Sequence, residues 1–175
     1  MAHKKTDEPP KTAGQLPVAV ASPADVGRLI QELEALDTTL LELELRQPGQ
    51  DVHLPRTSRL LGQIVELNKL NLLHKNDRQR LLRFLVTVKD RAPVLHMSFS
   101  SDPSPAFMEK LVSWLRKEIH TQVLVTVGLQ PTIGAGCIVR STNRYFDFSL
   151  RQDFVRKQNI LFDALTPKAK EAVTP

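Results

Sequence analysis

The sequence predicts an α+β protein in which a small N-terminal helical bundle precedes a C-terminal α/β module with a small mixed sheet and a terminal helix. Up to about residue 91, apolar residues recur at three- and four-residue steps, the period of amphipathic helices. After Ala92-Pro93, short β-branched runs flank one helical stretch, which indicates strands and a crossover helix. The expected parts are a flexible tail over 1–21, a helical domain over 22–92, an α/β domain over 93–165 and a second flexible tail over 166–175.

Three helices are expected in the N-terminal part. The first begins at Ser22-Pro23-Ala24-Asp25, where a hydroxyl, a proline at the first helical position and an acid form a variant of the capping box. Gln47-Pro48-Gly49 ends it. Its apolar stripe comprises Val26, Leu29, Ile30, Leu33, Leu36, Leu40 and Leu43. Helices over about 57–72 and 76–91 can cover this stripe, and Asn76-Asp77-Arg78-Gln79 again resembles a capping box.

The C-terminal part alternates strands with a helix. A strand is expected over Val94–Phe99, a helix from Asp102-Pro103-Ser104-Pro105 to about Ile119, and a strand from Gln122 that ends at Gly128. The order strand, helix, strand predicts a parallel pair. A hairpin with strands near 136–140 and 144–147 then leads into a last helix over 149–165.

Charge is unevenly distributed along the chain. From Ser22 to Gln50, six acidic residues stand against two basic ones, a net charge of −4. From Asp51 to Pro93, nine basic residues stand against four acidic ones, a net charge of +5. Helix faces that compensate one another explain this pattern, and a nucleic-acid footprint on the basic helices is the alternative.

The sequence contains no recognisable catalytic constellation, so no catalytic, metal or cofactor site and no enzymatic activity are expected. Its five histidines form no pair with metal-ligand spacing, and the single cysteine, Cys137, lies in an apolar run that favours a buried, inert thiol. No run of about 18 apolar residues predicts a membrane span, and the N-terminus lacks a signal-peptide core. These features predict a soluble protein.

The small-residue run Gly134-Ala135-Gly136 is expected to turn the chain. A Walker loop would end in Lys followed by Ser or Thr, whereas Cys137-Ile138-Val139 follows here. Both glycines suit a bulge or a close backbone crossing. Asp147 is expected to cap the last helix by accepting a free backbone N–H.

Residues 102–165 resemble the C-terminal domain of the delta subunit of F-type ATP synthases, the oligomycin-sensitivity-conferring protein family. Members show a Pro-initiated helix, a Val-rich strand, a "DPxxxGG" turn, a strand and "D-x-S-L" before the terminal helix. The matching positions are Pro131, Gly134, Gly136, Asp147, Ser149 and Leu150. Gln130 replaces the usual aspartate, Ala135 separates the two glycines, and the helical domain has fewer helices than is usual.

The resemblance implies a non-catalytic stator subunit of a proton- or sodium-translocating ATP synthase, without a cofactor. Its partners would be the N-termini of the alpha subunits and the b-type stalk subunits, with no nucleic acid. It would be cytoplasmic and peripheral to the inner or plasma membrane, which it would contact only through the complex. The candidate partner-binding residues are Leu29, Leu33, Leu36, Leu40, Phe154, Ile160 and Leu161. The alternative is a basic nucleic-acid-binding or translation-associated protein that uses residues 56–91.

Overall fold

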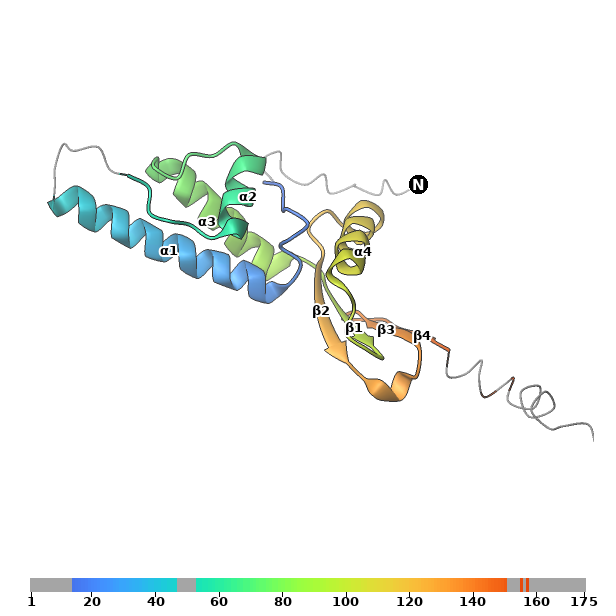
Figure 1. Cartoon of the computed structure of the whole chain (residues 1–175). Coiled ribbons are helices and arrows are strands. Elements are labelled where there is room, and N and C mark those ends of the chain that lie inside the picture. The colour runs from blue at the N-terminus through green and yellow to red at the C-terminus, as the bar shows by residue number, and fades with distance from the viewer. Residues whose placement is uncertain (1–13, 47–52, 151–154, 156, 158–175) are drawn as a thin grey trace, which may run out of the picture. The chain divides into compact units, whose positions relative to one another are not determined.

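The computed structural model describes residues 14–46, 53–150, 155 and 157, and within these it has the predicted α+β class (Figure 1). A helical N-terminal part is followed by strands and one further helix. The elements are α1 (Pro23–Arg46), α2 (Arg59–Asn68), α3 (Lys75–Arg91), β1 (Val94–Phe99), α4 (Pro105–Glu118), β2 (Leu124–Leu129), the 3-10 helix η1 (Pro131–Ile133), β3 (Gly136–Arg140) and β4 (Tyr145–Ser149).

The chain forms two compact units. Unit 1 comprises Met1–Leu95 with Ser104–Thr126, and unit 2 comprises His96–Pro103 with Val127–Pro175. Unit 1 therefore holds α4 and the first residues of β1 and β2 in addition to α1, α2 and α3, whereas the limits expected from the sequence place the change at residue 93.

The core of unit 1 lies beneath the leucine stripe of α1. Leu29, Leu33 and Leu40 are almost fully buried. They belong to one apolar cluster with residues of α2, α3 and β2, among them Leu61, Ile64, Leu81, Leu85, Val88 and Leu124. Apolar burial of this kind is the main stabilising contribution to a small domain. The periodicity that predicted three mutually packed helices is thus confirmed.

Residues 14–21 also belong to this core, although the sequence suggested that the flexible tail reaches Ala21. Leu16 and Val20 are buried, and the backbone N–H of Val125 donates to the carbonyl oxygen of Ala21 at 2.8 Å. This segment forms a turn but neither a helix nor a strand. Its two apolar anchors therefore follow no regular period, and periodicity could not detect them.

One predicted helix cap is present and another is not. At the start of α1, Ser22 N and Oγ donate to Asp25 Oδ2 at 2.9 and 2.8 Å, and Asp25 N donates back to Ser22 Oγ at 3.2 Å. The capping box expected at Asn76 is wrong, because α3 already begins at Lys75 and its N-cap, His74, makes no side-chain cap hydrogen bond. The carboxylate of Asp77 instead accepts from the backbone N–H of Asn71 at 3.0 Å.

The cap of α1 should make stability depend on pH. Burial raises the pKa of Asp25, but hydrogen bonds from Ser22 and the neighbouring Arg28 outweigh it and hold that pKa below its ordinary value of 3.8. A carboxyl whose pKa is lower in the folded state stabilises fully above its unfolded pKa and loses this contribution as the pH falls through the folded value.

We expect Asp25→Asn to lower the free energy of unfolding at pH 7 by about 1 kcal/mol. This deficit should shrink as the pH falls below the unfolded-state pKa and then through the lower folded-state pKa, because the wild-type carboxyl loses the charge that stabilises the cap. Urea denaturation at pH 7 and pH 3 measures both values. Glu44→Gln, an exposed change on the same helix, is the control and should alter neither. A deficit that is the same at both pH values would contradict the assigned role of the charge.

The four strands form one sheet in the order β2-β1-β3-β4. β3 pairs antiparallel with both β1 and β4. β1 and β2 run parallel: Leu124 N donates to Pro93 O at 3.0 Å and Gln130 N donates to Phe99 O at 2.8 Å, so the two strands keep one offset in the same direction. The predicted parallel pair and mixed sheet are confirmed. Gly128 does not end its strand as expected, because β2 continues to Leu129.

Candidate interaction surfaces

The Gly134-Ala135-Gly136 run turns the chain, as expected, between η1 and β3. Gly134 N donates to Pro131 O at 3.2 Å and has φ 75°, which closes the turn. Gly136 has φ 92°, and a Cβ at this position would lie 2.3 Å from the carbonyl oxygen of Phe148 on β4. Gly136 is therefore the point where β3 and β4 approach too closely for any side chain.

Asp147 and Leu150 fix the other side of this crossing. Asp147 lies opposite Ile138 in the β3–β4 pair, and its Oδ1 accepts from the backbone N–H of Ser149 at 2.8 Å. Leu150 N donates to Ala135 O at 3.0 Å, which ties the end of β4 to the glycine turn. Asp147 thus accepts a backbone N–H where its strand ends. The helix expected over 149–165 does not begin at Ser149, which still belongs to β4. Val155 and Lys157 are helical, and because the other residues after 150 lie outside the described ones, a cap at the N-terminus of this helix stays a prediction.

An aromatic surface follows β4. Phe146 and Phe148 are two positions apart and point to the same face of the sheet, where their rings stack with centroids 6.1 Å apart. They are 43% and 60% exposed. We call this pair the β4 strip. Two large aromatic side chains left in contact with water on one strand are typical of an interaction site.

The β4 strip continues the apolar face of unit 2. Phe146 lies opposite Val139, and Phe148 lies opposite Cys137. On the next strand, Met97 and Phe99 occupy the corresponding register positions and are buried. The same face of the sheet is therefore buried at β1 and exposed to solvent at β4. The strand expected over 144–147 included Phe146 but not Phe148, whereas β4 continues to Ser149. The signal that could have found this surface is the alternation of both phenylalanines with polar residues.

The leucines expected to bind a partner face inward. Leu29, Leu33, Leu36 and Leu40 are no more than 6% exposed and form part of the unit 1 core. The exposed leucines of α1 are instead Leu41 and Leu45, one turn apart and 52% and 75% exposed. Of the other predicted contact residues, Phe154, Ile160 and Leu161 lie outside the described residues.

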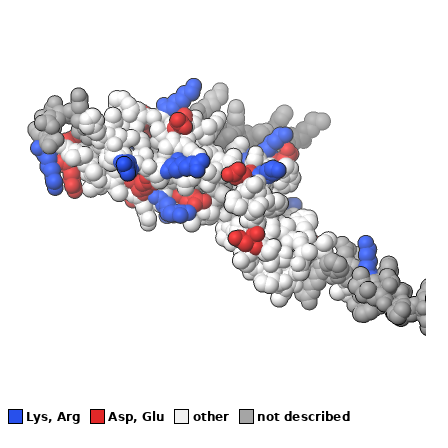
Figure 2. Space-filling model, viewed as in Figure 1, with Lys and Arg blue, Asp and Glu red and all other residues white. Residues whose placement is uncertain are grey.

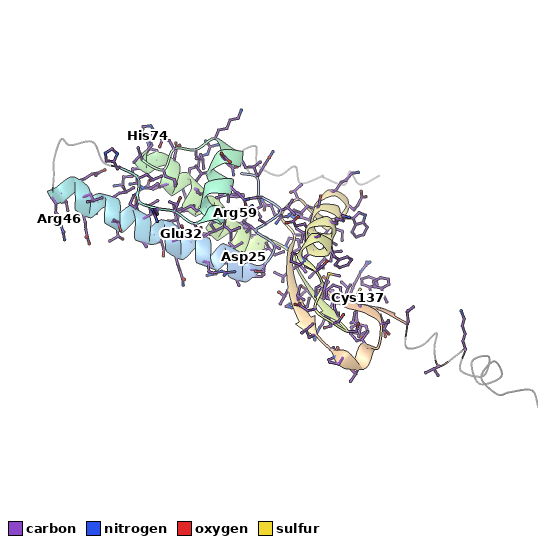
Figure 3. All side chains as sticks on the ribbon, viewed as in Figure 1. Asp25, Glu32, Arg46, Arg59, His74 and Cys137 are labelled. Atoms are coloured by element: carbon purple, nitrogen blue, oxygen red, sulfur yellow. The ribbon has the colours of Figure 1, made fainter. Side chains whose placement is uncertain are left out.

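Charges of both signs share the surface. Figure 2 shows Lys and Arg interspersed with Asp and Glu over the visible face of the helical part, whereas the strand part is mostly uncharged. Asp25 and Arg46 mark the two ends of α1 in Figure 3. Arg78, one of the nine basic residues between 51 and 93, is buried and pairs with Asp37 of α1 at 2.6 Å. Part of the charge asymmetry is therefore internal pairing between helices.

Groups that could carry chemistry are dispersed. Within the described ranges, no three His, Cys, Asp or Glu side chains are placed to hold a metal ion. Cys137 lies on β3 (Figure 3) and is half-buried rather than buried, and this burial raises the pKa of its thiol. Raising the pKa lowers the thiolate fraction at neutral pH. Across the helices that the structure describes, none is long and apolar enough to cross a membrane.

Compared with known proteins, the chain matches no protein-family model and no curated protein.

Proposed function

We propose that the chain is a non-catalytic stator subunit of an F-type ATP synthase, related to the delta subunit. The proposal rests on the observation that the residues matching the family motif form one local structure. Gly134 turns the chain, Gly136 allows the backbone of β4 to approach closely, and the backbone N–H of Leu150 donates to Ala135 O. Spacing and geometry therefore support the same interpretation of these residues. An aromatic surface lies directly beside them.

A stator needs two partner surfaces, one toward the catalytic head and one toward the stalk. In this proposal the β4 strip on unit 2 receives an amphipathic helix of a b-type stalk subunit, whose apolar face would cover Phe146 and Phe148. The exposed Leu41 and Leu45 on α1 of unit 1 offer an apolar contact to the N-terminal segments of the alpha subunits. The subunit would then hold the head against rotation from the cytoplasmic side and reach the membrane only through the complex, whether protons or sodium ions drive it.

The test changes the β4 strip without changing the core. We expect Phe148→Ser to weaken binding of a soluble b-type stalk segment from the same organism by about 30-fold or more, because buried aromatic side chains dominate such interfaces. Isothermal titration calorimetry on the full chain measures the affinity.

Tyr145→Ser is the matched control. Tyr145 lies on the same strand, is 62% exposed and points to the other face, so its loss should leave the affinity unchanged. Equal affinity for the wild type and both variants would show that the β4 strip does not contact the stalk.

A nucleic-acid-binding protein is the second candidate. Arg80, Arg83 and Arg91 on α3 are exposed, and they form no ion pair with any residue that the structure describes. A function based on these side chains requires affinity for DNA or RNA that falls steeply with salt, as counterions are released. Salt dependence therefore separates the two candidates.

A further inference from the structure

Residues 14–21, here named the strap, are bound to unit 1 in the manner of an extended peptide ligand. Asn68 of α2 bonds to both backbone groups of Gln15: Gln15 N donates to Asn68 Oδ1 at 2.7 Å, and Asn68 Nδ2 donates to Gln15 O at 2.9 Å. Leu16 and Val20 supply two buried aliphatic anchors four residues apart. The strap carries no charged side chain. Its recognition therefore rests on backbone groups and two apolar contacts, which many sequences could provide.

Arg116 of α4 binds the other end of the strap. Its Nη1 donates to Leu16 O at 2.9 Å and to Pro17 O at 2.8 Å, and its Nη2 donates to Val20 O at 2.6 Å. The Nε–H is buried and has no hydrogen-bond partner among the residues that the structure describes. Within the described part of the chain, no carboxylate pairs with this guanidinium.

This arrangement leaves a half-buried positive charge whose hydrogen bonds, among the described residues, all go to neutral carbonyl groups. Burial lowers the pKa of Arg116, which reflects the cost of holding its charge away from water. Arginine usually meets a carboxylate in such a place, because two parallel N–H groups match the two oxygens. Nε and Nη2 form one such parallel pair. Nη2 donates a hydrogen bond to Val20 O, whereas Nε donates none to the described residues. A carboxylate at the position of the Val20 carbonyl could therefore accept hydrogen bonds from both nitrogens.

We propose that the strap occupies a docking surface for the C-terminus of another protein, made by Asn68, Arg116 and the apolar core beneath Leu16 and Val20. The partner's last residue is aliphatic and takes the place of Val20, its terminal carboxylate bridges Nε and Nη2 of Arg116, and a second aliphatic residue four positions earlier takes the place of Leu16. When the partner replaces the strap, the hydrogen bond from Val125 N to Ala21 O is lost. A partner chain that ends at the position of Val20 has no following carbonyl group to replace it. The proposal concerns unit 1 alone and stands apart from the stator function.

The strap would act as a tethered competitor. A segment linked to its own docking surface competes at an effective concentration of about the millimolar range, so a free partner binds weakly until the strap is displaced. Opening the strap should therefore increase the affinity for a free peptide that carries the same anchors.

The experiment uses the full chain with Leu16→Ser and Val20→Ser, which removes both apolar anchors without adding a carboxylate near Arg116 and keeps Asn68 and Arg116. Its probe is the labelled heptapeptide GQLPVAV, made once with a free C-terminal carboxylate and once as the amide, with binding followed by fluorescence anisotropy. We expect the opened chain to bind the free acid at least about 10-fold more tightly than the amide, because the charge-assisted bidentate pair forms only with the acid. Adding Arg116→Gln should abolish this difference. Equal binding of acid and amide, or no binding by an opened chain with wild-type circular dichroism, would overturn the proposal.

A measurement on the wild type covers the case in which the opened chain does not fold. The backbone N–H of Gln15 reports the strap directly, since it donates to Asn68. We expect 1 mM free-acid peptide to accelerate hydrogen exchange at Gln15, as peptide replaces strap, and the amide to do so less. Exchange at Gln15 that neither peptide changes would show that the strap is a permanent part of the core.

Discussion

Arg78→Ala is expected to lower the free energy of unfolding of unit 1 by about 3 kcal/mol. Arg78 is 4% exposed and joins three segments: Nε donates to Asp37 Oδ1 of α1 at 2.6 Å, and Nη1 donates to Leu72 O and Leu73 O at 2.9 and 3.0 Å. Its loss leaves the buried carbonyl of Leu72 without this donor and a cavity beside it. Urea denaturation followed by circular dichroism gives the value.

Two variants separate the causes of this loss. Asp37→Asn should cost only about 1 kcal/mol, because the side chain of Asp37 is 43% exposed and water can replace much of the ion pair. Arg80→Ala, an exposed change on the same helix, should stay within about 0.5 kcal/mol of the wild type. If Arg78→Ala costs no more than Arg80→Ala, the role assigned to Arg78 in joining α1, α3 and the preceding loop is wrong.

Gly136→Ala is expected to break the β3–β4 hairpin. A Cβ would stand 2.3 Å from Phe148 O and 3.0 Å from Ser149 Cα, both in the backbone, and the φ of 92° is itself strained for alanine. We expect a destabilisation of unit 2 of at least about 3 kcal/mol. The measurement is hydrogen exchange at Leu150 N, which the wild-type bond to Ala135 O protects.

Gly134→Ala is the matched control in the same turn. Its φ of 75° also disfavours alanine, but apart from its chain neighbours no heavy atom of the described residues lies within 4 Å of the added Cβ. It should therefore cost only the conformational strain, about 1 kcal/mol. Equal protection of Leu150 N in both variants would mean that close approach at Gly136 does not hold the hairpin together.

The elements that local rules determine could be predicted from the sequence. The leucine stripe of α1 follows a helical period, Ser22 and Asp25 have the spacing of a capping box, and the β-branched runs after Pro93 are too short for helices. Each of these patterns is complete within one element. The corresponding helices and strands are present, with ends that differ by a few residues from those expected.

Features that depend on contacts with residues distant in sequence could not be predicted in this way. The strap is buried because α2, α4 and β2 supply its hydrogen bonds, and none of them is adjacent to it in sequence. Asp77 does not form a capping box with Asn76, because its carboxylate accepts a hydrogen bond from the backbone N–H of Asn71. The stripe of α1 identified a core face and could not distinguish it from a partner-binding face, since both are apolar. The exposure of Phe148 depends on which distant side chains cover that face of the sheet, and the sequence of β4 does not contain this information.

The most direct test of the stator function is a pull-down of the tagged full chain from lysate of its own cells at low and moderate salt, with retained proteins identified by mass spectrometry. The account predicts that ATP synthase alpha, beta and b-type subunits are retained at both salt concentrations, because apolar interfaces resist screening. Recovery of nucleic acid or ribosomal proteins alone, lost as the salt rises, would contradict it and would identify the basic residues of α3 as the functional surface.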